Sequence, residues 1–435
     1  MTDRLLTRPF VLAWLANLVQ GMAFTMFLHF PGFLLSMGAG EVEIGLIVGL
    51  TAVASIAVRP SVGRAMDERG RRPVIRLGNL LNVGVLALYL TVNHLGVWLY
   101  AVRITHGFAE ALLFTALFTY GADQVPASRR TEGIALFGIS GMLPIAIGGV
   151  LGDVVLARWD FHVFFVVVLG FGILALLLSL PLPESHLTGG PGERPQRFFA
   201  SVTQRNLLPL WWVTLVFSLA LTAYFTFLKT FVIDTGIGSV GLFFSAYAAT
   251  AIGLRLFGAW FPDRVGPKRV LYPALGSMVL GFMVLASASG NGAVTVAGVL
   301  CGAGHGYAFP IVMGMVVSRA ADADRGSAMA IFTGLFDVGA LLGGPAFGTI
   351  IRFGSYSSMF LAAAGWMLAG GLVYAFWDRA NPVAPPTIPR RRLGGTSMIP
   401  GESAAVPPDA APPDVLAGLT RLHRRLLRRP LRRHR

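Results

Sequence analysis

Twelve apolar stretches, each long enough to cross a lipid bilayer, follow one another along this 435-residue chain. A helix needs about 20 apolar residues to span the hydrocarbon core. Only 13% of the residues are charged, against about 25% in soluble domains. The stretches predict an all-α, polytopic membrane protein, with spans at 9–37, 44–64, 74–92, 97–121, 132–155, 163–182, 207–234, 239–261, 270–289, 293–318, 327–351 and 356–377.

The residue pattern within these stretches favours helices over strands. The chain contains 53 glycines, and small residues allow helices to pack closely in lipid. A membrane barrel would instead alternate polar and apolar residues over about ten positions, which these stretches do not do. The single cysteine, Cys301, excludes a disulfide within one chain.

A charged segment after the second stretch recurs 196 residues later, after the eighth. The first copy has Gly63, Asp67, Gly70, Arg71 and Arg72, and the degenerate second copy has Asp263, Arg264, Gly266 and Lys268. Further pairs match at nearly the same offset: Arg59 with Arg255, His106-Gly107 with His305-Gly306, and Gly148-Gly149 with Gly343-Gly344. Duplicated halves of six spans are typical of transporters. We therefore expect two six-helix bundles related by a pseudo-two-fold axis.

A hydrophilic segment rich in proline and glycine separates the two halves at 183–206. We expect one bundle over 1–182, a linker over 183–206, a second bundle over 207–380 and a tail over 381–435. Composition predicts that the tail is disordered. Its basic, leucine-containing end predicts contact with anionic lipid, and RNA or a regulatory partner is the alternative.

Basic residues predict the orientation of the chain in the membrane. Arginine and lysine concentrate in the loops on the side that holds both termini, whereas the opposite loops hold only Arg158 and Arg352. By the positive-inside rule both termini are cytoplasmic. The first apolar stretch is too long for a cleavable signal peptide. We therefore expect a multi-pass protein of the cytoplasmic membrane.

With these motifs, residues 1–380 resemble the major facilitator superfamily. The segment from Gly63 to Arg72 corresponds to the superfamily's loop signature, and Arg103 with Gly107 corresponds to its fourth-helix motif. The exporter motif is partly present, in Gly141, Pro144 and Gly148-Gly149. The chain looks like the bacterial drug and metabolite efflux branch, which implies alternating access around a central path lined by helices one, four, seven and ten.

Two aspartates occupy matching places in the charged segments. Asp67 and Asp263 can each meet the positive N-terminal end of a neighbouring helix. In the resembling family such a latch joins the two halves on the cytoplasmic side, and we expect it to gate transport here. The alternative is that these charges only obey the positive-inside rule.

Ionisable side chains inside the spans are candidates for proton coupling. Arg103, His106 and Glu110 share one helical face, and ionisable groups in a bilayer usually mark ion or substrate paths. Asp337, deep in the eleventh span, is the second candidate carboxylate. A permanent ion pair between Arg103 and Glu110 is the structural alternative.

Polar and aromatic residues at helical spacing predict a substrate-binding wall. The candidates are Asn17, Gln20, Phe24, Ser218, Thr222, Phe225 and His305. Interhelical hydrogen bonding is the alternative use of such polar side chains. A metal site shared by His106 and His305 is a further, weaker alternative.

The sequence thus predicts a secondary active transporter for a small organic solute, working by proton-coupled efflux. A proton-coupled uptake symporter and a non-transporting receptor or scaffold on the same fold remain the alternatives. The chain carries neither a phosphate-binding loop nor a catalytic signature. We expect a monomer that is not an enzyme, with no cofactor, no bound metal and no nucleic-acid partner.

Overall fold

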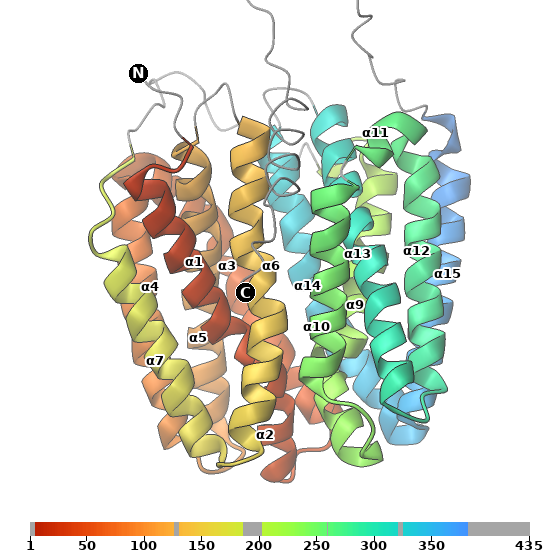
Figure 1. The fold of residues 1–435 in the computed structure, drawn as a ribbon, viewed down its shortest axis with the longest axis horizontal. Helices are drawn as coiled ribbons and strands as arrows, with labels where there is room; N and C mark the ends of the chain where they lie inside the picture. The colour runs from red at the N-terminus through yellow and green to blue at the C-terminus, as the bar shows by residue number, and fades with distance from the viewer. Residues whose placement is uncertain (1–4, 126–129, 186–201, 259, 321–324, 382–435) are drawn as a thin grey trace, which may run out of the picture. The chain divides into compact units, whose positions relative to one another are not determined.

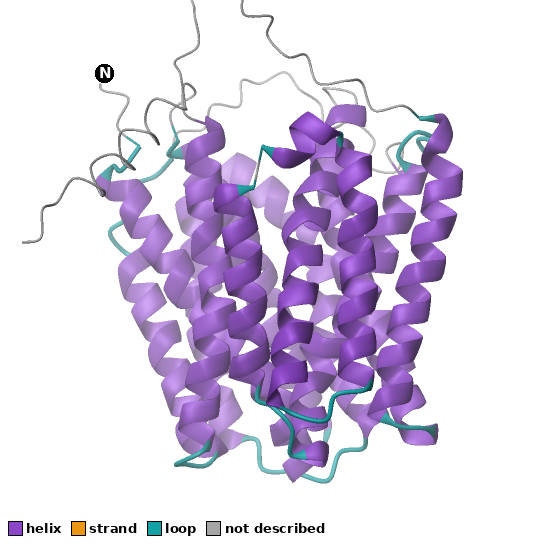
Figure 2. Ribbon diagram, turned by 45° about the vertical axis from the view of Figure 1, so that its right-hand side comes forward, coloured by secondary structure: helices purple, strands orange, loops and turns teal. Residues whose placement is uncertain are grey.

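The computed structural model describes residues 5–125, 130–185, 202–258, 260–320 and 325–381. Within these ranges the regular structure is helical (Figure 2). The helices of the first half are α1 (Arg8–Met26), η1 (Phe27–His29), α2 (Phe30–Ser36), α3 (Glu41–Arg69), α4 (Arg71–Leu88), η2 (Tyr89–Thr91), α5 (Val97–Asp123), α6 (Arg130–Leu156) and α7 (Phe161–Ser179).

The second half repeats this order. Its helices are α9 (Leu208–Thr235), α10 (Val240–Phe257), α11 (Phe261–Val265), α12 (Pro267–Ala286), α13 (Asn291–Arg319), α14 (Arg325–Phe353), α15 (Tyr356–Trp377) and η5 (Asp378–Ala380). Across the described residues, twelve helical segments are long and apolar enough to cross a membrane. This confirms the twelve predicted spans and the helical fold class. The tail and most of the linker lie outside the described residues.

The first predicted span is not one continuous helix. The three-residue element η1 separates α1 from α2, and Pro31 stands in the first turn of α2. Proline carries no backbone N–H to donate to the preceding turn, so the chain interrupts the regular hydrogen bonding at this point.

The charged segments are also more helical than predicted. The expected polar gap after residue 64 is occupied by the last turns of α3, which continues to Arg69. Gly70, with a φ of 90°, ends α3, and α4 begins at the next residue. Gly266, with a φ of 106°, has the same place between α11 and α12. Only glycine adopts such angles at low cost, so a single residue makes each turn.

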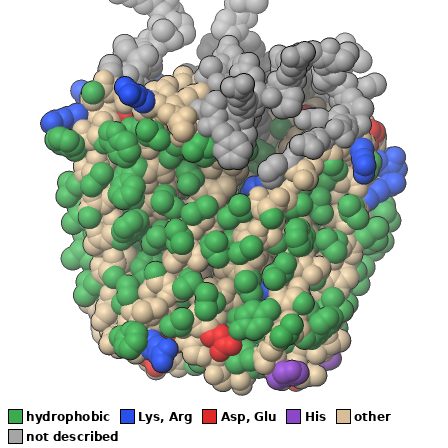
Figure 3. Space-filling model, turned by 180° about the vertical axis from the view of Figure 1, so that it is seen from behind, with side chains coloured by type: hydrophobic (Ala, Val, Ile, Leu, Met, Phe, Trp, Pro, Cys, Tyr) green, Lys and Arg blue, Asp and Glu red, His purple; other side chains and the backbone are tan. Residues whose placement is uncertain are grey.

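The two ends of the helical body differ in charge. We call the end with the Gly70 and Gly266 turns the arginine-rich end, and the opposite end, where α3 begins, the Glu41 end. Figure 1 shows the N-terminal helices on the left and the C-terminal helices on the right, with α11 at the top and α2 at the bottom. In Figure 3 most visible Lys and Arg side chains lie near the upper edge, and hydrophobic side chains cover the body below.

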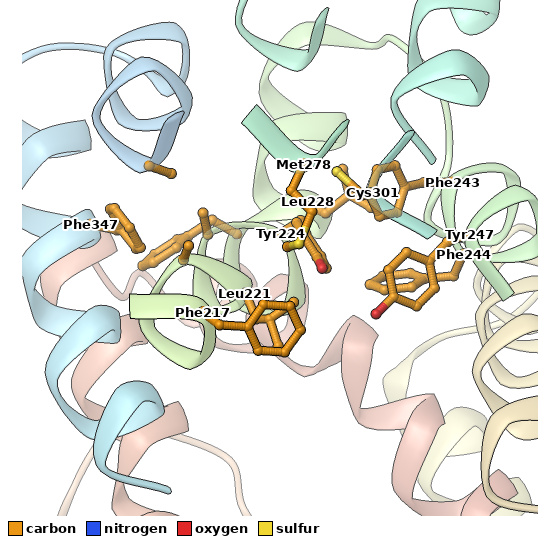
Figure 4. Close-up of a cluster of buried hydrophobic side chains, with 14 of the residues drawn as sticks. Phe217, Leu221, Tyr224, Leu228, Phe243, Phe244, Tyr247, Met278, Cys301 and Phe347 are labelled. Carbon is orange, nitrogen blue, oxygen red and sulfur yellow. The ribbon is translucent and has the colours of Figure 1, made fainter. Parts of the chain in front are cut away.

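Two clusters of buried hydrophobic side chains form the core: one lies within the first half, and the other extends through both halves. In the second half, aromatic and aliphatic side chains from six helices fill the centre, including Phe217, Tyr224, Phe243 and Tyr247 (Figure 4). Their rings are in contact, with Tyr224 and Phe243 centroids 5.2 Å apart. Aromatic contacts of this kind pack well in a lipid environment, where helix association depends on van der Waals fit.

The halves meet along two helix pairs, α3 with α14 and α6 with α10. Glycines at the Glu41 end bring these helices into backbone contact. A Cβ atom added to Gly45 would lie 2.2 Å from the carbonyl oxygen of Gly344. At the matching place in the other pair, a Cβ atom added to Gly241 would lie 2.7 Å from Cα of Val150. Both interfaces are therefore closed at the Glu41 end.

Candidate functional site

An ion pair joins the two halves in the interior of the helical body. Nε of Arg59, on α3, lies 2.7 Å from Oδ2 of Asp337, on α14. The two side chains are 19% and 18% exposed, so the pair is largely removed from solvent. Arg59 lies beyond Gly45 on α3, in the part of the helix that leads to the arginine-rich end. The pair thus follows the glycine contacts along the same interface.

A chain of polar contacts connects the ionisable residues of α5. Nη1 of Arg103 donates to the Tyr89 hydroxyl at 3.2 Å, and that hydroxyl lies 3.1 Å from Nδ1 of His106. Nε2 of His106 lies 3.2 Å from Oε1 of Glu110. Arg103, Tyr89 and His106 are buried. The structure therefore places the predicted trio in one network, with Tyr89 as an added member.

Arg103 and Glu110 make their direct contacts with different partners. Glu110 pairs with His106, whereas Arg103 donates to the backbone carbonyls of Ile47 and Val48. The guanidinium also lies over the ring of Phe30, 4.6 Å from its centroid. The Arg103 guanidinium is thus stabilised by hydrogen bonds to α3 and by the Phe30 ring. The Glu110 carboxyl contacts His106 instead.

Glu110 and Asp337 belong to different halves, and both lie beside α3: Ser55 donates to the carbonyl of Gly107, one turn before Glu110, and Arg59 pairs with Asp337. With Arg59 and His106 they form what we call the seam cluster: Arg59, His106, Glu110 and Asp337. Like charges at close range disfavour the simultaneous ionisation of both carboxyls. Arg59 lies in this cluster because the tertiary fold brings α3 against α14. In the sequence, only its repeat match with Arg255 drew attention to it. Tyr89 carried no such signal.

Polar links reinforce the closed interfaces at the Glu41 end. Oδ2 of Asp153, on α6, accepts a hydrogen bond from the backbone N–H of Gly241 at 2.6 Å, in the first turn of α10. Its other oxygen lies 2.9 Å from Nε2 of the buried His29. The Tyr356 hydroxyl, on α15, donates to Glu41 of α3. A carboxylate at a helix N-terminus is favourable, so Asp153 holds α10 from the opposite half.

At the arginine-rich end, each half contains a cluster of ion pairs. In the first half, the Arg71 side chain contacts Asp123 at 3.0 Å, and its backbone N–H donates to Glu184 at 2.8 Å. In the second half, Lys268 and Arg319 contact Asp378 at 2.8 and 2.7 Å. The first cluster connects the start of α4 to the end of α5 and to the segment after α7. The second connects the start of α12 to the end of α13 and to η5 after α15.

The Asp378 cluster leads to a stability prediction. Its carboxylate is fully buried and also accepts from Tyr374 and Asn381. Asp378→Ala leaves Lys268 and Arg319 without their buried counter-charge, a change that costs about 3–5 kcal/mol in comparable cases. We expect a large fall in thermal stability of the purified protein in detergent. Asp123→Ala, whose side chain is 32% exposed, is the control and should cost clearly less; equal losses would contradict the prediction.

The predicted gating residues have mixed outcomes. Gly70 and Gly266 form the turns, and Gly63 lies within α3. Arg72 lies at the start of α4, where its backbone N–H faces Glu184, and Arg264 stacks on Trp260 at 4.6 Å. The side chains of Asp67 and Asp263 lie outside the described residues. The cross-half latch therefore stays a prediction.

Most of the predicted substrate-binding residues take part in packing within one half. Asn17 donates to Ser140 at 2.8 Å, and Gln20 accepts from Asn82 at 3.2 Å. Ser218 and Thr222 donate to the backbone carbonyls of α14, at 2.9 and 3.4 Å. The interhelical alternative thus accounts for these four. Phe225 joins the aromatic core, and Phe24 is 53% exposed.

His305 and His106 do not share a metal site. Nδ1 of His305 contacts the Tyr247 hydroxyl in the second half, whereas His106 contacts Tyr89 in the first. Among the described residues, no group of three or more His, Cys, Asp or Glu side chains is arranged to hold a metal ion. Each histidine is bound to a tyrosine of its own bundle.

Comparison with known proteins identifies the family. The sequence model of the Major Facilitator Superfamily matches residues 13–294 and 234–431. The chain belongs to this superfamily, and it is a multi-pass membrane protein with the transporter fold of that family.

Several curated relatives cover most of the chain. It is 23% identical to the uncharacterized MFS-type transporter YhhS of Escherichia coli (strain K12) over 77% of this chain and 84% of that protein. It is 20% identical to the staphylopine export protein of Staphylococcus aureus (strain Mu50), over 80% and 89%. Among solved structures, the nucleoside transporter NupG has a TM-score of 0.69 at 14% identity, covering 86% of this chain and 100% of that one. The human organic anion transporter MFSD10 has a TM-score of 0.63 at 19% identity, covering 84% and 99%.

Proposed function

We propose that this protein is a proton-coupled exporter of a small organic solute. The observation that carries the proposal is the seam cluster, in which titratable groups of both halves meet at the interface that must open and close during alternating access. Ionisable groups at such a position respond to the conformation, because their protonation depends on neighbouring charges and on access to water.

Glu110 is the proton carrier in this proposal. It has a single histidine partner, whereas Asp337 is held by Arg59 at 2.7 Å. Opening the α3–α14 interface would separate Asp337 from Arg59 and change the field at Glu110. Arg103 and Tyr89 position His106 and do not themselves carry the proton. The coupling therefore links one carboxyl to the geometry of the interface.

The proposed location is the cytoplasmic membrane, with the arginine-rich end and both termini in the cytoplasm. This follows from the positive-inside rule. In that orientation the structure is closed toward the outside, since the Glu41 end carries the glycine contacts and the Asp153–Gly241 link. Small-molecule substrate would then enter from the cytoplasmic side and leave through the Glu41 end.

Export is favoured over uptake by two observations. The staphylopine export protein is among the relatives that cover most of the chain. The partial exporter motif reaches the inter-half contact, because Gly149 packs on Gly241 of the other half, whereas Gly148 packs on Thr25 of its own half. If the protein imports its substrate instead, right-side-out vesicles would accumulate the compound and inverted vesicles would not.

The test is gradient-driven accumulation by Glu110→Gln in inverted membrane vesicles, using a compound that the wild-type protein accumulates from a panel of candidate solutes. We expect accumulation against a gradient to be lost, while exchange of the same compound down its gradient is retained, because the substitution removes the proton site and keeps its shape. Glu43→Gln is the control, since Glu43 accepts from Tyr100 on α5 and lies at the Glu41 end.

Full accumulation by Glu110→Gln would disprove the assignment of the proton to Glu110. Loss of both accumulation and exchange would indicate a structural role instead. Accumulation that is insensitive to an imposed proton gradient in the wild-type protein would overturn proton coupling altogether.

A further inference from the structure

The seam cluster has no acidic counterpart in the pseudo-symmetric position. Arg59 on α3 matches Arg255 on α10, and the α3–α14 interface matches the α10–α6 interface, where Gly241 and Gly149 repeat Gly45 and Gly344. At the offset of the repeat, however, Asp337 is replaced by Met142. Glu110 is likewise replaced by Phe309. The pseudo-symmetric site around Arg255 therefore keeps the cation and has an apolar residue at both acidic positions.

Arg255 accordingly has no ion-pair partner among the described residues. Nε of Arg255 is buried, and it has no hydrogen-bond partner among the residues that the structure describes. Its guanidinium lies 5.9 Å from the ring centroid of Phe309, at the outer limit of a cation–π contact. An uncompensated guanidinium inside a membrane protein is costly, so its retention needs a reason.

The groups around Arg255 favour an anion. His305 on α13 stacks on Phe309, the ring that the guanidinium faces, and its Nδ1 contacts the hydroxyl of Tyr247 on α10. When Tyr247 donates to Nδ1, the ring proton of His305 lies on Nε2, which is then a second donor. No acidic side chain pairs with Arg255 in the described part of the chain.

We infer that Arg255, with His305 beside it, binds the acidic group of the transported solute. The guanidinium presents a planar fork that matches a carboxylate through two parallel hydrogen bonds. This inference rests on the proposed transport function and names its substrate class, an organic carboxylate.

The neighbouring side chains predict the rest of the ligand. Phe309 stacks with His305 at 5.7 Å and contacts Phe332 and Phe336 of α14, with centroids 5.4 and 5.5 Å away. An aromatic wall beside a single cation suits an anion with a planar, apolar body. A highly polar, multiply charged solute would leave its other charges against these rings.

The experiment compares an aromatic acid with its neutral amide. Binding of radiolabelled naphthoate and naphthamide is measured at equilibrium to the purified full-length protein in detergent, without a proton gradient. We expect the wild-type protein to prefer naphthoate, Arg255→Gln to bind naphthoate about 30-fold more weakly, as for the loss of one partner of a buried charge pair, and Arg255→Lys to lie between. Arg352→Gln, at an exposed arginine of the same half, is the control and should bind as the wild type does.

Three results would overturn the inference: equal naphthoate affinity in Arg255→Gln and wild type, equal affinity of the wild type for naphthoate and naphthamide, or an equal loss of both compounds in Arg255→Gln. The last would show that Arg255 supports the conformation rather than the anion. If Arg255→Gln does not fold, the naphthoate affinity of Arg255→Lys is the test, because lysine keeps the positive charge and lacks the planar guanidinium. Wild-type affinity in Arg255→Lys would then contradict the inference. Since no gradient is used, the result is independent of proton coupling, which the Glu110→Gln assay tests separately.

Discussion

Replacing Gly45 by valine should abolish transport and hold the protein open at the Glu41 end. A Cβ atom at residue 45 would lie 2.2 Å from a backbone oxygen of α14, and one at residue 344 would lie 2.4 Å from the oxygen of Gly45. Neither helix can relieve this contact by a side-chain rotation, because the clashing atoms are backbone atoms. The α3–α14 interface must therefore separate.

The opening can be measured as a distance. Spin labels at Arg158→Cys and Ser289→Cys report on the two halves, because both residues are exposed and lie in turns at the Glu41 end. Cys301 is buried and should remain unlabelled. We expect the Gly45→Val variant to show a longer distance than the same double-cysteine protein without this substitution. Gly84→Val is the matched control, since a Cβ atom there meets nothing within 4 Å.

A wild-type distance together with wild-type transport in Gly45→Val would contradict the expected effect. If Gly45→Val keeps the wild-type distance between the labels but does not transport, the glycine contact is needed at a step other than closing the Glu41 end. The same comparison at Gly344 provides an independent measurement, because the contact is reciprocal.

Asp337→Asn should reduce gradient-driven transport by about tenfold or more. The substitution leaves Arg59 without its only cross-half counter-charge among the described residues. Losing one partner of such a pair costs about 2–5 kcal/mol, and each 1.4 kcal/mol is about tenfold in an equilibrium constant. The conformation closed at the Glu41 end should be the one that becomes less populated, because the pair forms across its interface.

The double variant Arg59→Gln, Asp337→Asn separates two roles of Asp337. If Asp337 serves mainly to neutralise Arg59, the double variant should transport better than Asp337→Asn alone, since no unpaired charge remains. If Asp337 carries a proton itself, the double variant should stay uncoupled and retain only downhill exchange. Transport by Asp337→Asn at the wild-type rate would contradict both roles.

The seam cluster explains why Glu110 and Asp337 were both reasonable candidates from sequence. Each is an isolated carboxyl in an otherwise apolar span, and this pattern is recognisable without a fold. Their place in one cluster depends on α3, which packs on α5 within the first half and on α14 across the interface. Sequence spacing carries no information about contacts between residues that are more than 200 positions apart.

The substrate-binding predictions illustrate the opposite case. Asn17, Gln20, Ser218 and Thr222 stand at helical spacing, and the same spacing serves interhelical hydrogen bonds equally well. Only the rotation of each helix within its bundle distinguishes the two uses. The rotation of α1 turns Gln20 toward Asn82, and that of α9 turns Ser218 toward a carbonyl of α14.

By itself the sequence determined the class of fold, because an apolar stretch of about 20 residues has few stable alternatives to a helix in a bilayer. It also indicated the duplication, since Arg59 matches Arg255 and Gly148-Gly149 matches Gly343-Gly344 at nearly the same offset. The tertiary structure alone decided that Asp337 pairs with Arg59, whereas Arg255 has no acidic partner among the described residues. That difference depends on the pairing of α3 with α14 and of α10 with α6, which is set by close glycine contacts between the two halves and not by any local pattern.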